Sequence, residues 1–422
     1  MNFSSSPNIF KESYDILDNI LRRGGYSTLE LNRAAASDTV RRIVLGTLDK
    51  NFELEYIINN LSESKPKPVI MTLLKMAAYC LLYMDSLKPY AVVNESVKIL
   101  SSVGKSALSG YVNAILNKIA KREFNLPKED DKLYLSVKYN KPEWFIEAVK
   151  KEYSSADAEK IFCAKPPSGV HIRINGRLYN GQAFERALTE NGESFVKSPA
   201  GGYFAEISKT VREMFRLGLI TYQGVSSMLA VQALSIEQSD DVLDACAAPG
   251  GKSVYASELA SLGSVTACDV HEHRLDLIKS YAARMRADNV SVEKRDATEF
   301  HDDYFEAFDK VLVDAPCSGL GTAPEKPDVL INKTAESIKE LPELQLAILK
   351  NTAKYLKKGG ALVYSTCTLL KAENREVVAR FLSEDVGFIL EKMDIPIDNA
   401  GEVQILPQEG ADGFFIAKLR KI

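Results

Sequence analysis

The chain has 422 residues, 45% of them hydrophobic, and a formal net charge of −4. Because this length exceeds what one ordinary hydrophobic core supports, two or three domains are expected. The small negative charge argues against a protein that coats nucleic acid indiscriminately, since such binding depends on an excess of cationic side chains.

No part of the sequence has the composition of a membrane anchor or an export signal. No run reaches the about 18 apolar residues that a membrane-spanning helix needs, and the N-terminus lacks a secretory pattern. No Cys-x-x-Cys pair or histidine spacing predicts a zinc site or a disulfide framework. We therefore expect a soluble, cytoplasmic protein without a metal, in which six cysteines are reduced: Cys80, Cys163, Cys246, Cys268, Cys317 and Cys367.

Residues 1–126 are predicted to form a bundle of helices. Their apolar side chains recur at three- and four-residue spacing, as in a first helix with Phe10, Tyr14, Leu17 and Leu21 on one face. This region also holds an excess of Lys and Arg over Asp and Glu. Its arginines at positions 22, 23, 33, 41 and 42 fit two interpretations, contacts with a polyanion or solvated positions on helix surfaces.

The rest of the chain is predicted to form two further domains. The polar stretch 127–132 contributes nothing to a core and predicts a linker. Residues 133–235 mix a helical segment around Trp144 with short alternating runs such as 170–175, a pattern that predicts a small α+β domain. In residues 236–422, strand patterns alternate with helix patterns, which is typical of parallel strands with helices on both faces. We predict a doubly wound, Rossmann-like α/β domain there.

Acidic residues follow the predicted strands of this last domain. Asp244 opens a loop of small residues that ends in Pro249-Gly-Gly-Lys252, and adjacent glycines let a ligand approach the backbone. Asp269 and Asp296 follow the next two strands, where carboxylates suit ribose hydroxyls and an adenine amino group. The loop matches neither glycine pattern of phosphate-binding loops, and its carboxylate favours a cationic ligand such as S-adenosylmethionine. Taken without the carboxylates, the glycines fit an alternative interpretation, a tight structural turn between strand and helix.

Two cysteines close apolar, strand-like runs in the same domain. Cys317 follows residues 311–316, and Cys367 follows residues 361–366. Because ligands of open α/β sheets bind outside the carboxyl ends of the strands, the two thiols are predicted to share one pocket and to serve covalent catalysis. The alternative is a pair of small buried hydrophobic residues, the ordinary state of a free cysteine.

These motifs resemble the RNA cytosine-5 methyltransferases over essentially the whole chain. The resemblance rests on the loop at 244–252, Asp-Ala-Pro-Cys-Ser at 314–318, Tyr-Ser-Thr-Cys-Thr at 364–368, Glu373-Asn374, and Asp-Gly-Phe-Phe at 412–415. Through 44–48, 90–95 and 112–116, the helical region is similar to the NusB-like domain of a subfamily that acts on 16S rRNA. The resemblance implies a NusB-like domain at 1–126, a small α+β domain at 133–235, and an S-adenosylmethionine-dependent methyltransferase domain at 236–422.

The resemblance also implies roles for individual residues. Cys367 is the expected nucleophile that adds to carbon 6 of cytosine, and Cys317 the base or release group that breaks the adduct. Asp314 is expected at the N3 and amino edge of cytosine, and Lys252 beside the Cys367 thiolate, unless Lys252 merely caps a solvated helix. The expected cofactor-binding residues are Cys246, Ala247, Ala248, Pro249, Gly250, Gly251, Lys252, Asp269, Asp296 and Asp314.

Arg173 and Asn175 resemble a family segment that faces RNA. Two stretches depart from the family pattern: an acidic pair is missing at 223–227, and basic residues and a tryptophan are replaced at 322–331. We expect a monomer that methylates carbon 5 of a loop cytosine in 16S rRNA. Two alternatives stay open, the same chemistry on tRNA or 23S rRNA, and an RNA-binding antitermination protein with a vestigial enzyme domain.

Overall fold

The computed structural model describes residues 8–166, 169–384, 386–408 and 411–422. The chain divides into two compact units. One consists of Met1–Lys151 with the distant segment Lys326–Ala335, and the other of Glu152–Glu325 with Glu336–Ile422. None of the described helices is long and apolar enough to cross a membrane.

The first unit is helical, as the apolar spacing predicts. Helix α1 begins at a side-chain cap, because Asn8 Oδ1 accepts from the backbone N–H groups of Phe10 and Lys11, and it ends at Gly24, whose φ is 70°. The bounds of its helices are α1 (Ile9–Arg23), α2 (Ser27–Arg33), α3 (Asp38–Asp49), α4 (Asn51–Leu61), α5 (Pro68–Tyr83), α6 (Pro89–Ser102), η1 (Ser106–Leu108), α7 (Ser109–Ala120), α8 (Tyr134–Tyr139), α9 (Glu143–Glu152) and α16 (Asp328–Asn332).

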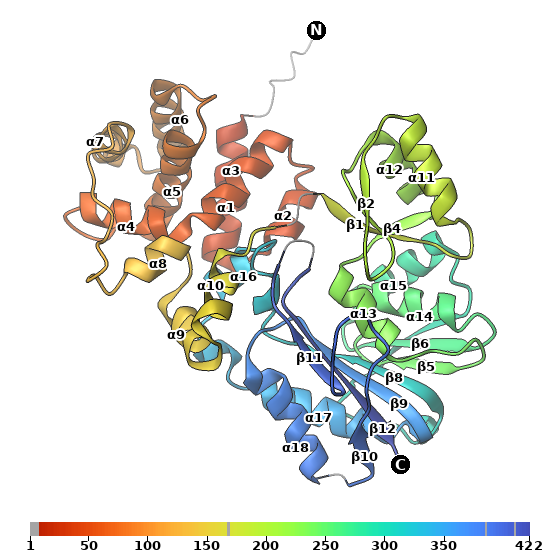
Figure 1. The fold of residues 1–422 in the computed structure, drawn as a ribbon. Coiled ribbons are helices and arrows are strands. Elements are labelled where there is room, and N and C mark those ends of the chain that lie inside the picture. The colour runs from red at the N-terminus through yellow and green to blue at the C-terminus, as the bar shows by residue number, and fades with distance from the viewer. Residues whose placement is uncertain (1–7, 167–168, 385, 409–410) are drawn as a thin grey trace. The chain divides into compact units, whose positions relative to one another are not determined.

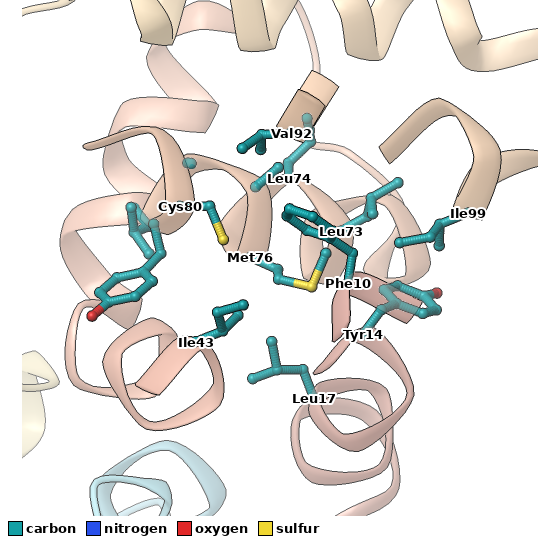
Figure 2. Packing of buried hydrophobic residues seen from close by; sticks show 14 of the residues in the cluster. Phe10, Tyr14, Leu17, Ile43, Leu73, Leu74, Met76, Cys80, Val92 and Ile99 are labelled. Carbon is teal, nitrogen blue, oxygen red and sulfur yellow. The ribbon is translucent and has the colours of Figure 1, made fainter. Parts of the chain in front are cut away.

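Helix α5 lies in the core of this unit and contacts α1, α3, α4, α6 and α7. Figure 2 shows Leu73, Leu74 and Met76 of α5 packed among Leu17 of α1 and Ile43 of α3. All five side chains are at most 1% exposed. The hydrophobic face that α1 shows in the sequence is therefore the face that the bundle buries.

The first unit ends later than the boundary predicted at 126. The predicted linker is tied to α4, because the Tyr56 hydroxyl donates to Asp131 over 3.1 Å. At the end of α8, Asn140 Oδ1 accepts from the backbone N–H of Glu53 over 3.0 Å. Helices α8 and α9, which the sequence assigned to a middle domain, thus belong to the helical unit.

Helix α16 comes from the stretch that departs from the family pattern. Its first residue, Asp328, is 2% exposed and accepts from both the hydroxyl and the backbone N–H of Ser27, over 2.5 and 3.2 Å. At its other end, Asn332 donates to the carbonyl of Gly25. The replaced residues therefore form part of the helical unit, although the sequence predicted a strand-and-helix domain for the whole of 236–422.

The second unit contains a small antiparallel sheet of strand order β2-β3-β1-β4. Its elements are α10 (Ser155–Cys163), β1 (Val170–Ile174), α11 (Gly181–Glu190), β2 (Phe195–Lys197), β3 (Tyr203–Ala205), α12 (Lys209–Arg216) and β4 (Ile220–Tyr222). Phe184 and Leu188 of α11 and Val211 of α12 pack against this sheet in one fully buried cluster. The alternating pattern at 170–175 is thus a real strand, in an α+β arrangement.

The same unit contains the larger mixed sheet, whose strand order is β10-β12-β9-β8-β5-β6-β7, with β11 paired to β12. Strands β5 to β9 are parallel, and β10, β11 and β12 run antiparallel to their neighbours. The strands are β5 (Asp241–Asp244), β6 (Ser264–Asp269), β7 (Val290–Lys294), β8 (Phe308–Asp314), β9 (Leu356–Thr366), β10 (Phe388–Leu390), β11 (Glu402–Ile405) and β12 (Phe414–Lys421). The helices are α13 (Val225–Ala233), α14 (Gly251–Leu259), α15 (Glu272–Met285), η2 (Asp302–Tyr304), η3 (Leu320–Thr322), η4 (Glu336–Ile338), α17 (Leu341–Ala353), η5 (Lys371–Glu373) and α18 (Arg375–Glu384).

Helices cover both faces of this sheet, with α13, α14 and α15 on one face and α17 and α18 on the other (Figure 1). Successive residues of β8 alternate between the two layers, since Val311 and Val313 pack with α17 and α18 whereas Leu312 packs with α13 and α14. A strand that is buried on both faces consists of consecutive apolar residues, and the sequence has such a run at 311–313. The doubly wound prediction is confirmed.

Arg173 and Asn175, which resemble a family segment that faces RNA, have buried side chains in this structure. Arg173 is 3% exposed, and its guanidinium donates to Gln223 over 2.6 Å and to Glu258 over 2.5 Å. Asn175 is fully buried and donates to the carbonyls of Gly218 and Met285. Arg173 joins the small sheet to α14 and Asn175 joins it to α15. Local sequence cannot reveal such contacts.

Candidate active site

The candidate site lies where the strand order of the large sheet reverses. From β5 the chain proceeds to β6 and β7 on one side, then returns to β8 and β9 on the other side of β5. Open α/β sheets bind ligands outside the carboxyl ends of the strands at such a switch point. The segment 244–252 begins at the end of β5, so the predicted cofactor loop occupies this position.

The conformation of this loop depends on its glycines. Ala247 N–H donates to the Cys268 carbonyl over 2.8 Å, which holds the loop against β6, and the Ala248–Pro249 peptide bond is cis. Gly250 has a φ of 106°, and a Cβ there would lie 3.2 Å from the Ile278 backbone. A side chain would be both strained and crowded, so Gly250 is required for helix α14 to start at Gly251.

Asp244 at the end of β5 has an oxygen without a partner. Its Oδ2 accepts from the Ser253 hydroxyl over 2.6 Å, but its Oδ1 is buried and has no hydrogen-bond partner among the described residues. Burial raises the pKa of Asp244 to about 6, although the Ser253 hydrogen bond and the charge of Lys252 act in the opposite direction. A buried, unpaired carboxylate oxygen is costly, which indicates a site for a cationic donor.

Of the next two predicted carboxylates, Asp269 is the last residue of β6 and Asp296 follows β7, and each has internal partners. Asp269 is 4% exposed, lies 3.2 Å from the guanidinium of Arg274, and accepts from the backbone N–H of His271 over 3.0 Å. Asp296 accepts from both the N–H and the hydroxyl of Thr298, and these bonds lower its pKa. Both carboxylates are thus held in fixed orientations as hydrogen-bond acceptors.

Lys252 and Asp314 form an ion pair at the ends of β5 and β8. Lys252 Nζ lies 2.7 Å from Asp314 Oδ2, and the Ser365 hydroxyl donates to Asp314 Oδ1 over 2.8 Å. Burial lowers the pKa of Lys252, but Asp314, Asp244 and Cys367 together outweigh it and raise that pKa. Lys252 is therefore a cation directed into the site, and the interpretation of it as a solvated cap is excluded.

The two predicted thiols meet at the ends of the adjacent strands β8 and β9. Cys317 Sγ lies 3.3 Å from Cys367 Sγ, and both residues are partly exposed. The hydrogen bond to Cys367, burial, and the Cys367 charge raise the pKa of Cys317 well above its usual range. The raised pKa favours the thiol form of Cys317. Either sulfur can act as the donor of this hydrogen bond. The partial exposure of both residues argues against the interpretation of the pair as fully buried hydrophobic side chains.

One buried carboxylate, Glu373, holds both cysteine loops. It is 1% exposed and accepts from the N–H and hydroxyl of Ser318, over 2.8 and 2.5 Å, and from the Thr368 hydroxyl over 3.2 Å. Gln345 of α17 donates to it as well, over 3.0 Å. Since Ser318 follows Cys317 and Thr368 follows Cys367, Glu373 determines where the two thiols lie. The sequence contained this residue in a motif but assigned it no role.

Asn374 supports the second loop from the other side. Its Oδ1 accepts from the Thr366 hydroxyl over 2.5 Å, and its Nδ2 donates to the Thr368 carbonyl over 3.2 Å. The residues on both sides of Cys367 are therefore fixed by one side chain. Within the described residues, no group of three or more His, Cys, Asp or Glu side chains could hold a metal ion.

Comparison with known proteins gives two family matches. Residues 231–420 match the model of the 16S rRNA methyltransferase RsmB/F family, and residues 10–121 match that of the NusB family. The chain is 35% identical over 408 residues to a protein named probable ribosomal RNA small subunit methyltransferase B of Bacillus subtilis, covering 90% of this chain and 89% of that one. It is 32% identical over 397 residues to ribosomal RNA small subunit methyltransferase B of an Enterobacter species, covering 90% of each chain.

Among solved structures, the crystal structure of PH0851 superposes on the whole chain with a TM-score of 0.85 at 26% identity, and each chain is covered completely. The fold, both family matches and the relatives thus agree over nearly the full length. The chain therefore belongs to the RsmB/F family of 16S rRNA methyltransferases, which are S-adenosylmethionine-dependent enzymes, and it carries a NusB domain ahead of the methyltransferase domain.

Proposed function

We propose that the protein methylates carbon 5 of a cytosine in 16S rRNA through a covalent bond between Cys367 and carbon 6. The observation that carries this proposal is the pair of thiols 3.3 Å apart at the switch point of the sheet. Carbon 5 of cytosine is a weak nucleophile, and addition of a thiolate to carbon 6 makes it electron-rich. Methylation of a lone-pair nitrogen or oxygen would require no thiol.

The residues at the end of β5 fit S-adenosylmethionine. When bound, this cofactor supplies an electrophilic methyl group on a sulfonium centre. The unpaired Asp244 Oδ1 suits its cationic ammonium group, and the small residues of 246–251 allow it to approach the backbone. Asp269 at the end of β6 and Asp296 after β7 suit hydrogen bonds from the ribose and the adenine amino group.

Asp314 and Lys252 would act on the cytosine ring and on the thiol. Asp314 would receive the N3 and amino edge of the base, where negative charge is displaced during addition. Lys252 places a positive charge beside the thiol pair, and a nearby cation favours the thiolate that attacks carbon 6. The Cys367 sulfur contributes the electron pair of the new bond, and carbon 5 gains the electron density for methylation.

Cys317 would release the product. Before the reaction, Cys367 keeps Cys317 protonated through its hydrogen bond and charge. Once Cys367 is bonded to carbon 6, both causes disappear, so Cys317 can lose its proton to solvent and become a base. It then takes the carbon 5 proton, the freed electron pair forms the carbon 5–carbon 6 double bond, and Cys367 leaves as a thiolate.

The modified base can be mapped directly. Purified protein, S-adenosylmethionine and unmodified 16S rRNA are expected to yield a single bisulfite-resistant cytosine, whereas 23S rRNA and tRNA under the same conditions yield none. Methylation of tRNA or 23S rRNA alone would assign the enzyme another substrate. Binding of 16S rRNA without any resistant cytosine would favour the vestigial-enzyme alternative.

Cofactor affinity is expected to fall on acidification. Because the Asp244 pKa is about 6, the carboxyl is ionised at about pH 7.5 and mostly protonated at about pH 5. Protonation removes the anion that would pair with the cofactor's ammonium group, so affinity should fall about tenfold, one decade per pH unit below the pKa. Calorimetric titration across this range tests it, with Asp244→Asn as the control that should bind weakly and without this pH step. An unchanged step in that variant would contradict the assignment.

A further inference from the structure

The helical unit contains two adjoining cavities that the methylation reaction does not use. One has a volume of about 420 Å³ and is lined by residues of α1, α4, α5, α9 and α16. The other measures about 550 Å³ and is lined by residues of α4, α8 and α9. They share four residues, which form the boundary between them: Phe52, Glu55, Pro142 and Trp144. We call these two cavities the Trp144 groove.

The smaller cavity is cationic. Arg22, Lys65, Lys75 and Lys333 line it, against the single carboxylate of Glu55. Glu55 is already paired with the buried Lys75, over 2.6 Å, and with Lys65, over 3.0 Å. Lys65 is 72% exposed, and Lys333 is partly exposed and has no ion pair within the described parts of the chain. Arg22 is paired with Asp18 over 2.7 Å. Two carboxylates thus neutralise part of the charge of four cationic side chains, and positive charge exceeds negative charge at this end, as a phosphate group requires.

The larger cavity has aromatic and amide groups. Trp144 and Tyr56 line it, and the Tyr56 hydroxyl is engaged by Asp131. Asn59 also lines it, and its Oδ1 is buried with no hydrogen-bond partner among the described residues. A buried amide oxygen without a donor is costly, so its position indicates a ligand that presents an N–H group. Glu143 adds a second acceptor to the same wall.

We propose that the Trp144 groove binds an unpaired RNA nucleotide, with its base in the larger cavity and its phosphate in the cationic one. Stacking on an aromatic ring beside a basic patch is how proteins hold single-stranded RNA. The exocyclic amino group of adenine or cytosine would donate to Asn59 Oδ1. A basic peptide would meet four cationic side chains in the smaller cavity and is disfavoured. This proposal rests on the proposed function, because it gives the 16S rRNA substrate a second contact.

The chain contains its own probe, because Trp144 is the single tryptophan of 422 residues. Oligoadenylate added to the full-length protein is expected to quench tryptophan emission as the base stacks, whereas an RNA duplex of equal length does so weakly. Unchanged emission while a labelled oligonucleotide binds, measured by anisotropy, would overturn the proposal. So would quenching by a lysine-rich peptide but not by oligoadenylate.

Charge-matched variants test the phosphate contact. Lys65→Gln with Lys333→Gln should weaken oligoadenylate binding at least about tenfold and reduce the salt slope by about 1.4, as for two lost phosphate contacts on a single strand. The control is Lys118→Gln with Lys150→Gln, two exposed lysines of α7 and α9 that do not line either cavity. If both double variants weakened oligoadenylate binding equally, the effect would come from net charge alone, and the proposed phosphate site would be wrong.

Methylation assays separate this proposal from the proposed function. The groove variant should raise the KM for 16S rRNA about tenfold and leave kcat unchanged, because neither Lys65 nor Lys333 belongs to the proposed catalytic residues. Unchanged KM with an active wild-type enzyme would sink the groove alone. A wild-type protein that methylates no 16S cytosine, yet shows quenching that depends on Lys65 and Lys333, would sink the proposed function and support the groove.

Discussion

Replacing Cys367 with alanine is expected to abolish methyl transfer and covalent attachment to RNA together. Loss of a covalent nucleophile removes the reaction path itself, so we expect the rate to fall by at least about 10⁴-fold. The measurements are transfer of labelled methyl groups to 16S rRNA and the protein–RNA adduct on a denaturing gel. Cys163→Ala is the control, because that thiol is exposed and lies on α10, outside the strand ends that carry the site. Normal turnover in Cys367→Ala would disprove the covalent mechanism.

Cys317→Ala should behave in the opposite way and accumulate the adduct. Attack by Cys367 and methylation still proceed, but the base that takes the carbon 5 proton is gone, so the protein stays bonded to methylated RNA. The gel should show a shifted band that depends on S-adenosylmethionine and on Cys367. If Cys317→Ala showed full methyl transfer and no shifted band, another group would release the product.

Glu373→Gln is expected to slow the reaction strongly without removing a reacting group. Its carboxylate accepts from Ser318, Thr368 and Gln345, and an amide that presents its NH₂ to one of these donors leaves a buried donor unpaired, at a cost of about 1–3 kcal/mol. Because Ser318 and Thr368 are adjacent to the two cysteines, the thiols would shift. A misplacement of about 1 Å lowers rates by roughly 10²-fold, so we expect a fall of that size in kcat.

Glu373 does not touch the substrate in this scheme and is a positioning residue, so RNA affinity and KM should stay near wild-type values. Single-turnover rates of adduct formation in the Cys317→Ala background measure its effect directly. Glu376→Gln is the matched control, since Glu376 lies three residues after Glu373, on α18, and its side chain is exposed. A variant that loses stability on denaturant titration but keeps the wild-type kcat would restrict Glu373 to a structural role.

Much of the fold and part of the candidate site could be predicted because their signals are local. Three- and four-residue spacing identifies the helices around Leu17, and the apolar run at 311–313 identifies a strand buried on both faces. In a parallel sheet every carboxyl end points to the same edge, so Asp244 and Asp314 could be placed at one site from strand position alone. The distances between their side chains could not be predicted in this way.

The sequence by itself determined that a helical unit precedes a sheet covered by helices, and that the chemistry lies at the carboxyl edge of that sheet. Both follow from local signals, namely the spacing of apolar residues and the residues at the ends of the strands. Only the tertiary structure decided which groups meet there: that Cys317 contacts Cys367, that Glu373 holds both loops, and that Arg173 is buried. It also decided that α16 belongs to the helical unit. These contacts join residues up to about 300 positions apart, as from Ser27 to Asp328, and their energies depend on burial and partners that local patterns do not encode.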